Sequence, residues 1–308
     1  MHEDLVKNIP LIRDDPIRAS EPGNRCALHP AYVLLLDLVR KYRNICQDAL
    51  GVMFGVDQSA VCRYIRVADR MLAAMLPTPY RFMDVLRHVH SPKEFAALFP
   101  EGAEADTILV DGTHVRFVRA GEKGVRDAMY SGKKKAYTGN TVLVAMPDGM
   151  TIAISRTYEG SVHDITITRE FLGDLGAFAE DVLKADLPKE TRGMILRVLG
   201  DAGFRGLGKD MPGAEVVTPV KKPKGGELTG RQKAHNKRLS RERARVENAI
   251  ASVRHHRRVS SVYEGTLEDF NAEFNVACGL ANARLMLRNG TYNHWQSVLD
   301  GDGGGRGR

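Results

Sequence analysis

Two apolar runs that each end in an aspartate constrain the fold of this chain more than any other feature. Residues 108–110 (Ile-Leu-Val) lead into Asp111, and residues 195–200 (Ile-Leu-Arg-Val-Leu-Gly) lead into Asp201. Short apolar runs bounded by turn residues are typical of buried strands. A third acid, Glu247, lies in a stretch with helical periodicity, Arg-Ala-Arg-Val-Glu-Asn-Ala-Ile. The pattern predicts a mixed α/β chain in which two strand-end carboxylates and one helical carboxylate converge.

Three carboxylates of this kind predict a metal centre. Carboxylate oxygens are ligands that Mg²⁺ prefers, and a pair of Mg²⁺ or Mn²⁺ ions can activate a nucleophilic oxygen and neutralise the leaving oxygen of a phosphodiester. Taken singly, a strand-end aspartate is usually a turn residue, and a glutamate among arginines is usually a solvated ion pair. The three together favour Asp111, Asp201 and Glu247 as catalytic metal ligands.

The surroundings of these acids resemble those of a known enzyme family. Six segments in a fixed order carry the resemblance: Val-Asp-Gly-Thr-His (110–114), Tyr-Ser-Gly-Lys-Lys-Lys (130–135), Gly-Ser-Val-His-Asp (160–164), Gly-Asp-Ala-Gly-Phe (200–204), Arg-Val-Glu (245–247) and Gly-Leu-Ala-Asn (279–282). They are similar to the DDE transposases of the insertion-sequence-5 type, relatives of the Harbinger transposases. The resemblance implies a ribonuclease H-like core that cleaves DNA at transposon ends and joins the freed 3′ end to target DNA.

A signature of related transposases, Tyr-x2-Arg-x3-Glu-x6-Lys, falls on Ser240, Arg243, Glu247 and Arg254. Its spacing is kept, although Ser replaces Tyr and Arg replaces Lys. The resemblance implies that Arg243 holds the Glu247 carboxylate or clamps a phosphate oxygen. Arg254 is the weaker candidate for a terminal phosphate contact.

Other residues of the matching segments are candidates for supporting roles. In the family, the pair His163 and Asp164 lies near the site, so Asp164 is expected to assist metal or substrate. The alternative is a helix cap at Asp164 with His163 bonding locally. His114 is expected to pack in the first strand or approach the substrate. Three successive lysines are expected to follow DNA phosphates, with a solvated loop as the alternative: Lys133, Lys134 and Lys135.

Positive charge is concentrated in one part of the chain. The net charge is +7, but residues 221–258 hold 13 Lys/Arg and 3 Asp/Glu, a local +10 that leaves about −3 elsewhere. Concentrated cations favour phosphate backbones through counterion release. We therefore expect Lys221, Lys222 and Lys224 to contribute to DNA binding, unless this segment is only a solvated face.

An all-α segment is predicted before the catalytic part. Helices are expected near 31–39 and 45–54, and Gly55 and Asp57 then precede a third apolar stripe, Val61, Ile65, Ala68 and Leu72. This arrangement is typical of a helix-turn-helix in which Gln58, Ser59 and Arg63 face the major groove. The alternative is a packing helix hairpin.

The domain organisation predicted from these patterns has five parts. They are an irregular lead-in (1–30), a helix-turn-helix domain (31–79), a helical connector (80–106), a ribonuclease H-like catalytic domain (107–290) and a flexible tail (291–308). Within the catalytic part we expect a strand through 107–117, a hairpin around Asp148-Gly149, a helix over 165–172, strands at 195–200 and 215–220, a basic loop 221–230, and helices over 236–256 and from Thr266.

Composition bounds the setting. Hydrophobic and charged fractions of 43% and 27% are those of an ordinary globular protein. The four cysteines are scattered without a CxxC pair, which predicts neither a zinc site nor a disulfide framework. No signal peptide or membrane span is visible. We expect a cytoplasmic protein associated with double-stranded DNA, both transposon ends and target, and assembled as a homo-oligomer on it.

Two other classes of function remain open. A transposase-derived DNA-binding regulator would keep the helix-turn-helix and would lose carboxylates, whereas all three are present. Another ribonuclease H-like nuclease would share the three acids but not the residues around 160–164 and 245–247.

Overall fold

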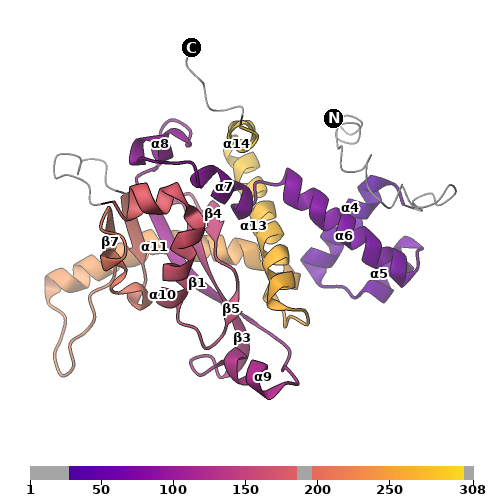
Figure 1. The fold of residues 1–308 in the computed structure, drawn as a ribbon, viewed down its shortest axis with the longest axis horizontal. Coiled ribbons are helices and arrows are strands. Elements are labelled where there is room, and N and C mark those ends of the chain that lie inside the picture. Colours follow the sequence, from indigo (N-terminus) through magenta and orange to yellow (C-terminus); the bar gives the residue numbers. More distant parts are fainter. Residues whose placement is uncertain (1–27, 186–195, 302–308) are drawn as a thin grey trace, which may run out of the picture.

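The computed structural model describes residues 28–185 and 196–301. A group of three helices stands at one end of the molecule, and a sheet covered by helices forms the remainder (Figure 1). This mixture of helix and sheet confirms the predicted α/β class. The predicted lead-in and the last residues of the tail lie outside the described residues. None of the described helices is long and apolar enough to cross a membrane.

The helical unit at this end comprises α4 (Pro30–Arg43), α5 (Gln47–Phe54) and α6 (Gln58–Met75). Asp57 caps the start of α6, because its side chain accepts a hydrogen bond of 2.7 Å from the Ala60 backbone N–H. Gly51 is needed inside α5, since a Cβ there would lie 2.7 Å from the Val56 carbonyl oxygen. Apolar side chains of the three helices form a core of their own. The helices of the prediction are therefore present, while their DNA-binding role stays a prediction.

The predicted connector is part of the main core. It contains α7 (Pro79–Leu86) and α8 (Pro92–Ala97). Phe82, Met83 and Leu86 of α7 are buried in the same apolar cluster as the sheet. Residues 80–106 thus bind to the sheet rather than span a gap between two units.

One mixed sheet organises the rest of the chain. Its strands are β1 (Thr107–Arg116), β2 (Tyr130–Ser131), β3 (Ala136–Ala145), β4 (Thr151–Ile154), β5 (Tyr158–Glu159), β6 (Leu196–Gly200) and β7 (Ala214–Val217). Their order is β2-β3-β1-β6-β7, with β4 and β5 also paired to β3. β1 is antiparallel to β3 and parallel to β6, and β6 is parallel to β7. The central strand therefore joins an antiparallel half to a parallel half.

Short elements complete the layers on and around the sheet. They are α9 (Lys123–Met129), α10 (Asp164–Leu172), the 3₁₀ turns Gly173–Leu175, Ala202–Phe204 and Leu207–Lys209, and a π-helical turn Phe178–Leu183. Four helices follow the last strand: α11 (Gly230–Arg254), α12 (Arg257–Ser260), α13 (Leu267–Asn289) and α14 (Tyr292–Leu299).

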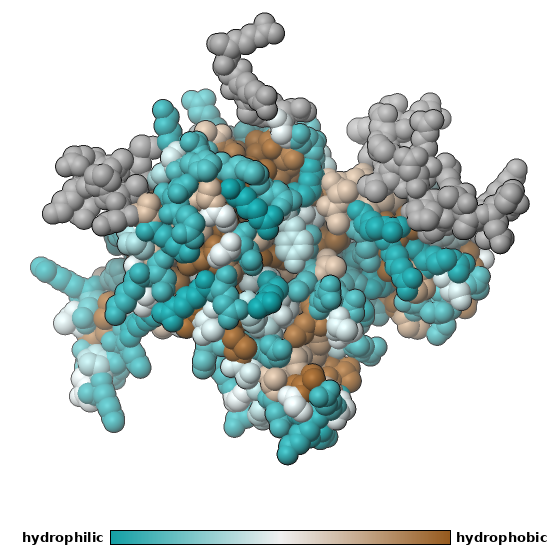
Figure 2. Space-filling model, in the orientation of Figure 1, coloured by the Kyte–Doolittle hydropathy of each residue, from teal (hydrophilic) through white to brown (hydrophobic). Residues whose placement is uncertain are grey.

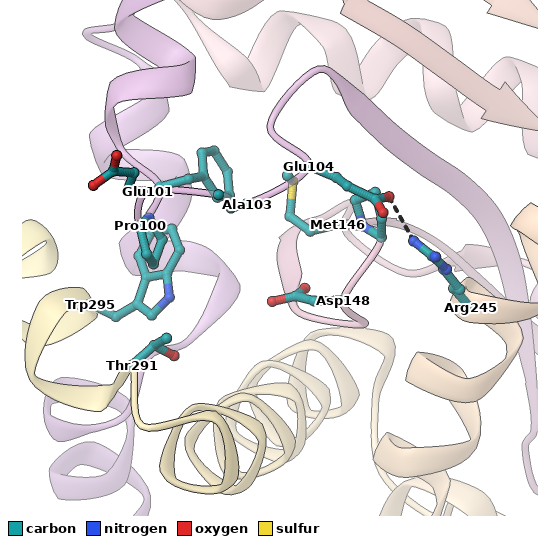
Figure 3. A pocket seen from close by; sticks show the side chains of 12 residues that line it. Pro100, Glu101, Ala103, Glu104, Met146, Asp148, Arg245, Thr291 and Trp295 are labelled. Atoms are coloured by element: carbon teal, nitrogen blue, oxygen red, sulfur yellow. Dashed lines mark hydrogen bonds and ion pairs between the residues drawn. The ribbon is translucent and has the colours of Figure 1, made fainter.

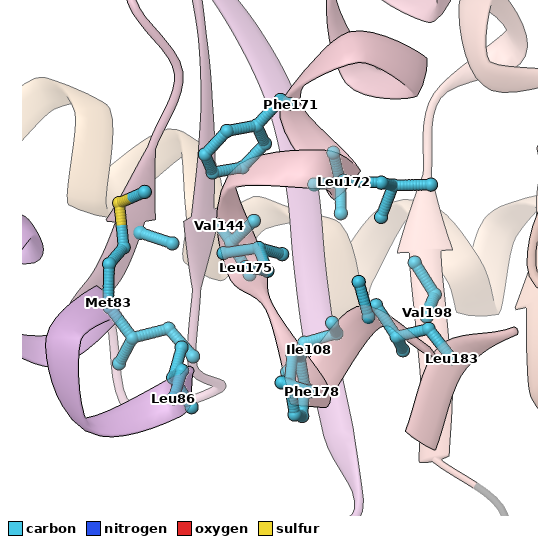
Figure 4. Close-up of a cluster of buried hydrophobic side chains, with 14 of the residues drawn as sticks. Met83, Leu86, Ile108, Val144, Phe171, Leu172, Leu175, Phe178, Leu183 and Val198 are labelled. Atoms are coloured by element: carbon cyan, nitrogen blue, oxygen red, sulfur yellow. The ribbon is translucent and has the colours of Figure 1, made fainter. Parts of the chain in front are cut away.

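Alternation along the strands divides the buried side chains between two faces. On one face, Ile108 and Val198 pack against α7, α10 and the turns after it, and Figure 4 shows Phe171 and Phe178 in this cluster. On the other face, Leu109 and the remaining strand side chains pack against α11 and α13. The outer surface seen in Figure 2 is mostly hydrophilic, with small apolar patches.

A buried network of six charged side chains joins the helical unit to the main body. It consists of Asp37, Arg40 and Lys41 on α4, Asp69 on α6, Arg258 on α12 and Glu273 on α13. The Glu273 carboxylate is 6% exposed, pairs with Arg40, and accepts a hydrogen bond of 2.7 Å from Lys41 Nζ. The network contains three cations and three carboxyl groups, and each cation has at least one acidic partner.

The two buried acids of the network titrate in opposite directions. Burial tends to raise the pKa of Glu273, but Lys41 and Arg40 outweigh it and lower the pKa to about 2. Burial raises the pKa of Asp37 to about 7, against the lowering effect of Lys41. The two carboxyls share the same cations, and the short contacts to Lys41 and Arg40 favour Glu273 as the one that keeps its charge.

Two boundaries in the last third differ from the prediction. α11 begins at Gly230 rather than near 236, because Thr229 and Gln232 form a reciprocal capping box. The flexible tail predicted from 291 is wrong for its described part, since α14 is a helix. Trp295 is 3% exposed, and its ring packs edge-on against Phe82 and Phe99 at centroid distances of 5.3 and 5.1 Å.

Candidate active site

The two aspartates lie next to each other on neighbouring strands. Val110 of β1 pairs with Gly200 of β6 at the end of their parallel ladder, so the following residues, Asp111 and Asp201, occupy adjacent positions. Because side chains alternate along a strand, both share the face of Leu109, which α11 covers. The predicted convergence of these two strand-end carboxylates thus follows from the parallel pairing of β1 and β6.

The Asp111 carboxyl is enclosed by protein groups. Its side chain is 17% exposed; one oxygen accepts a 2.9 Å hydrogen bond from the Gly112 backbone N–H, and the other lies 3.4 Å from Arg243 Nη2. Burial raises the pKa of Asp111 to about 6, and Arg243 and the Gly112 N–H act to lower it. The Asp201 and Asp164 carboxylates raise it further. Negative charge is therefore crowded at this point of the sheet.

Asp201 has a local role in addition to its position beside Asp111. It caps the 3₁₀ turn that follows β6, where its Oδ1 accepts a 2.7 Å hydrogen bond from the Gly203 backbone N–H. The second oxygen of the same carboxylate remains available for another ligand. Asp201 can therefore cap the turn with one oxygen and still bind a metal ion with the other.

Glu247 lies on the flank of α11 that faces β1. Arg243, one turn earlier, reaches Asp111, and Arg254, two turns later, donates to Thr113 Oγ1 at 2.8 Å and to the His114 carbonyl oxygen at 3.0 Å. Glu247 sits between them on the same stripe and is exposed. Among the described residues, no group of three or more His, Cys, Asp or Glu side chains is close enough to hold a metal ion. The structure thus brings Asp111 and Asp201 together, and leaves Glu247 on the adjacent helix.

Asp164 approaches the site from the opposite face of the sheet. It is the first residue of α10, and the cap position belongs to His163, so the alternative of a cap at Asp164 is wrong. Its Oδ1 instead accepts a 2.6 Å hydrogen bond from Asn140 Nδ2 on β3. The carboxyl packs against Gly112, where a Cβ would lie 2.7 Å from Asp164 Cγ. His163 is exposed.

His114 links the site to the turn that carries the three lysines. Burial lowers the pKa of His114, the Asp164 carboxylate raises it, and Lys134 and Lys133 lower it. Its Nδ1 is buried and has no hydrogen-bond partner among the described groups. Lys133, Lys134 and Lys135 form an exposed turn between β2 and β3. These lysines therefore stand at the margin of the carboxylate cluster.

The remaining predicted contacts lie on exposed surfaces. Gln58, Ser59 and Arg63 are exposed at the start of α6, where the Gln58 amide donates a 2.6 Å hydrogen bond to Gln47 of α5. A second group, Lys221, Lys222 and Lys224, is exposed in the loop between β7 and α11. This loop is anchored at its start by Asn236, which bonds both backbone groups of Val220.

Sequence reasoning missed Asn140 and Gly112. Asn140 is fully buried in a strand of mostly small and apolar residues, and it pairs with His114 across the ladder. A buried amide needs a hydrogen-bond partner, so an asparagine inside such a strand could have indicated a polar partner at the site. Gly112 follows Asp111 in the middle of β1, where a residue without a side chain leaves room for Asp164.

Comparison with known proteins agrees with this geometry. The profile of the DDE superfamily endonuclease family matches residues 110–282, which begin just before Asp111 and extend into α13. The chain belongs to this family. It is 25% identical over 282 residues to the probable transposase for insertion sequence element IS702 of Microchaete diplosiphon, a match that covers 91% of this chain and 90% of the relative. No solved structure matches the chain.

Proposed function

We propose that the protein is an insertion-sequence transposase, which cuts DNA at the ends of its element and joins the freed 3′ end to target DNA. The observation that carries the proposal is the position of Asp111 beside Asp201 under α11, within the segment that belongs to the endonuclease family. The transposase relative, which is similar over nine tenths of both chains, favours transposition over a general nuclease function.

The side chains at the site have the chemistry that a divalent metal needs, and a shift of Glu247 toward Asp111 and Asp201 would complete the ligand set. They supply carboxylate oxygens, which suit Mg²⁺ or Mn²⁺. Burial, and to a smaller extent the neighbouring Asp201 and Asp164 carboxylates, raise the pKa of Asp111, and a bound cation would favour its charged form. Asp111, Asp201 and Glu247 would hold the ions, two in number as for other enzymes that cut phosphodiesters with paired metals. When bound, the ions supply Lewis-acid activation of the attacking oxygen and stabilise the leaving oxygen.

The protein's own side chains have separate tasks around the scissile phosphate. Arg243 neutralises Asp111 and presents its remaining donors toward the same face, where they can clamp a phosphate oxygen. Arg254 fixes the last turns of α11 against β1 and so sets the position of Glu247. Asp164, held by Asn140, supports the site from the other face, and His163 stands exposed beside it at the start of α10.

DNA contacts are proposed for three exposed groups. The first turns of α6 would read bases through Gln58, Ser59 and Arg63, as the recognition helix of a helix-turn-helix does. The lysine turn 133–135 and the loop 221–224 would follow phosphates. We further propose a ribonuclease H-like core, supported by a central strand with an antiparallel partner on one side and parallel strands on the other. The protein would act as a homo-oligomer on DNA in the cytoplasm.

A cleavage assay tests the proposal directly. Asp111→Asn, Asp201→Asn and Glu247→Gln keep side-chain volume but remove the charge that holds the metal, so each should abolish Mg²⁺-dependent cutting of duplex that carries the element's end. Binding of the same duplex should stay within a few-fold of the parent protein. Asp174→Asn, an exposed aspartate on the turn after α10, is the matched control and should cut normally.

Each outcome has a defined meaning. Near-normal cutting by one variant would remove that residue from the metal site. Sequence-specific binding by the parent protein without cutting in Mg²⁺ or Mn²⁺ would refute the transposase and favour a DNA-binding regulator.

A further inference from the structure

α11 has a second polar flank on the side away from the carboxylates. Arg245, Asn248, Ser252 and His255 recur at intervals of three, four and three residues, so they share one stripe of the helix. Arg243, Glu247 and Arg254 belong to the stripe on the other flank. The second stripe forms one wall of an open groove of about 410 Å³, and the opposite wall carries Arg284 and Arg288 of α13.

The groove is rich in positive charge. Arg284 and Arg288 are exposed and one turn apart, so their guanidinium groups face the same side of α13. Arg245 lies at the rim, paired at 2.7 Å with Glu104, which Figure 3 shows at the edge of an adjoining pocket. One lining carboxylate, Asp148, is exposed and accepts a 2.9 Å hydrogen bond from the Met150 backbone N–H, so the lining sets three arginines against one aspartate.

The dimensions of the groove suit a nucleic-acid strand. The stripe from Arg245 to His255 extends over ten residues of helix, or about 15 Å at 1.5 Å per residue. One strand of duplex DNA carries a phosphate about every 3.4 Å along its axis, so this length corresponds to about four phosphates. The Asn248 amide and the Ser252 hydroxyl supply neutral donors of the kind that position DNA backbones.

We propose that this groove binds the sugar-phosphate backbone of a DNA segment other than the one held at the carboxylates. The choice of DNA as ligand rests on the proposed function, and the location of the groove does not. Because α11 stands between the two sites, DNA in the groove does not compete for Asp111 and Asp201. The groove gives the protein separate places for two DNA segments.

A protein partner fits the groove less well. Protein interfaces centre on aromatic and apolar side chains, whereas the described lining residues of this groove include no Tyr, Trp or Phe. Aromatic side chains gather instead in the adjoining pocket, which is lined by Phe99 and Trp295. Guanidinium groups combined with small neutral donors match a polyanionic backbone better than a folded surface.

The test uses full-length protein and a duplex of random sequence, without divalent metal so that nothing is cut. Loss of two phosphate contacts in Arg284→Ala/Arg288→Ala should make the plot of log K against log salt less steep by about 1.8, at roughly 0.9 per contact. The double lysine variant at the same positions should keep most of the slope. Lys93→Ala/Lys209→Ala removes two exposed charges outside the groove and is the matched control.

A variant that should bind DNA more tightly provides a second test. Glu104→Gln removes the carboxylate that neutralises Arg245, so affinity for the random duplex should rise several-fold at low salt. The proposal would be overturned if the alanine pair kept the parent's salt slope, or if the control pair lost as much slope as the alanine pair. A changed oligomeric state in size-exclusion chromatography with unchanged DNA binding would also overturn it, in favour of a protein partner.

Cutting separates this proposal from the proposed function. A short duplex that carries only the element's end should be cut by the alanine pair at a rate within about twofold of the parent, because the groove lies off the carboxylate face. If the alanine pair shows the shallower salt slope but the parent protein never cuts, the groove proposal is supported and the transposase proposal fails. If the parent protein cuts normally and the salt slopes of parent and alanine pair are equal, the transposase proposal is supported and the groove proposal fails.

Discussion

The substitution Glu273→Gln tests whether the buried charge network holds the helical unit to the body of the molecule. The expected loss of stability follows from the pKa of the Glu273 carboxyl, which the fold lowers from an ordinary 4.5 to about 2. At 1.36 kcal/mol per unit, this shift corresponds to about 3 kcal/mol of stability at neutral pH. The figure agrees with the ~3–5 kcal/mol that is lost when one partner of a buried ion pair is removed. The amide leaves Lys41 and Arg40 buried without their shared counter-charge.

Urea denaturation of the full chain provides the assay. The single tryptophan, Trp295, reports on the body through its fluorescence, and far-UV circular dichroism reports on all helices. Glu273→Gln should lower the free energy of unfolding by about 3 kcal/mol at pH 7. Glu268→Gln, an exposed neighbour on α13, should change it by no more than about 0.5 kcal/mol.

The pH dependence has a definite sign. Since the folded-state pKa of Glu273 is depressed, its contribution is present above pH 4.5 and is lost as the pH falls toward 2. The difference in free energy of unfolding between the parent and Glu273→Gln should therefore narrow by about 1 kcal/mol between pH 7 and pH 4. A difference below 1 kcal/mol at pH 7, or one that widens in acid, would refute the reasoning.

Three further predictions concern the active site and the DNA-reading helix. Gly112→Ala places a methyl group against Asp164 and should slow cleavage on the order of 100-fold; normal cutting with an unchanged thermal melt would show that Asp164 is dispensable. Arg243→Gln removes the cation that lowers the pKa of Asp111, so the acid limb of the cleavage rate against pH should move to higher pH, and an unmoved limb would exclude Asp111 as the titrating group. Arg63→Ala should reduce the preference for end sequence over random duplex by about 1–3 kcal/mol in competition binding, while metal-dependent nicking of random DNA survives; full discrimination would mean that α6 is not the reader.

Local sequence signals predicted much of the site's framework. The short apolar runs before Asp111 and Asp201 predicted two strand ends, and the parallel pairing of these strands in the structure places the two aspartates side by side. The helical periodicity of α11 likewise placed Arg243, Glu247 and Arg254 on one stripe. These inferences hold because they depend on side-chain alternation and helical spacing within a single element.

Features that depend on distant partners could not be read from the chain. Glu273 pairs with Arg40 across 233 residues of sequence, and an isolated glutamate in a helix carries no sign of such a partner. α14 is stabilised by the contacts of Trp295 with Phe82 and Phe99, while its own sequence is short and polar enough to suggest a tail. The early start of α11 was hidden because its first turns are polar and lack an apolar stripe.

The three carboxylates of the site are attached to the fold with different degrees of stiffness. Asp111 belongs to the central strand, where the ladder to β3 continues from Leu109 to Arg116 and holds the backbone on both sides of it. Asp201 begins a short turn just past the last paired residue of β6, and Glu247 lies on an exposed flank of α11, outside the sheet. Asp111 is thus the most firmly held of the three, and a shift of the Asp201 and Glu247 side chains toward it is the smallest movement that would bring all three carboxylates to one metal ion.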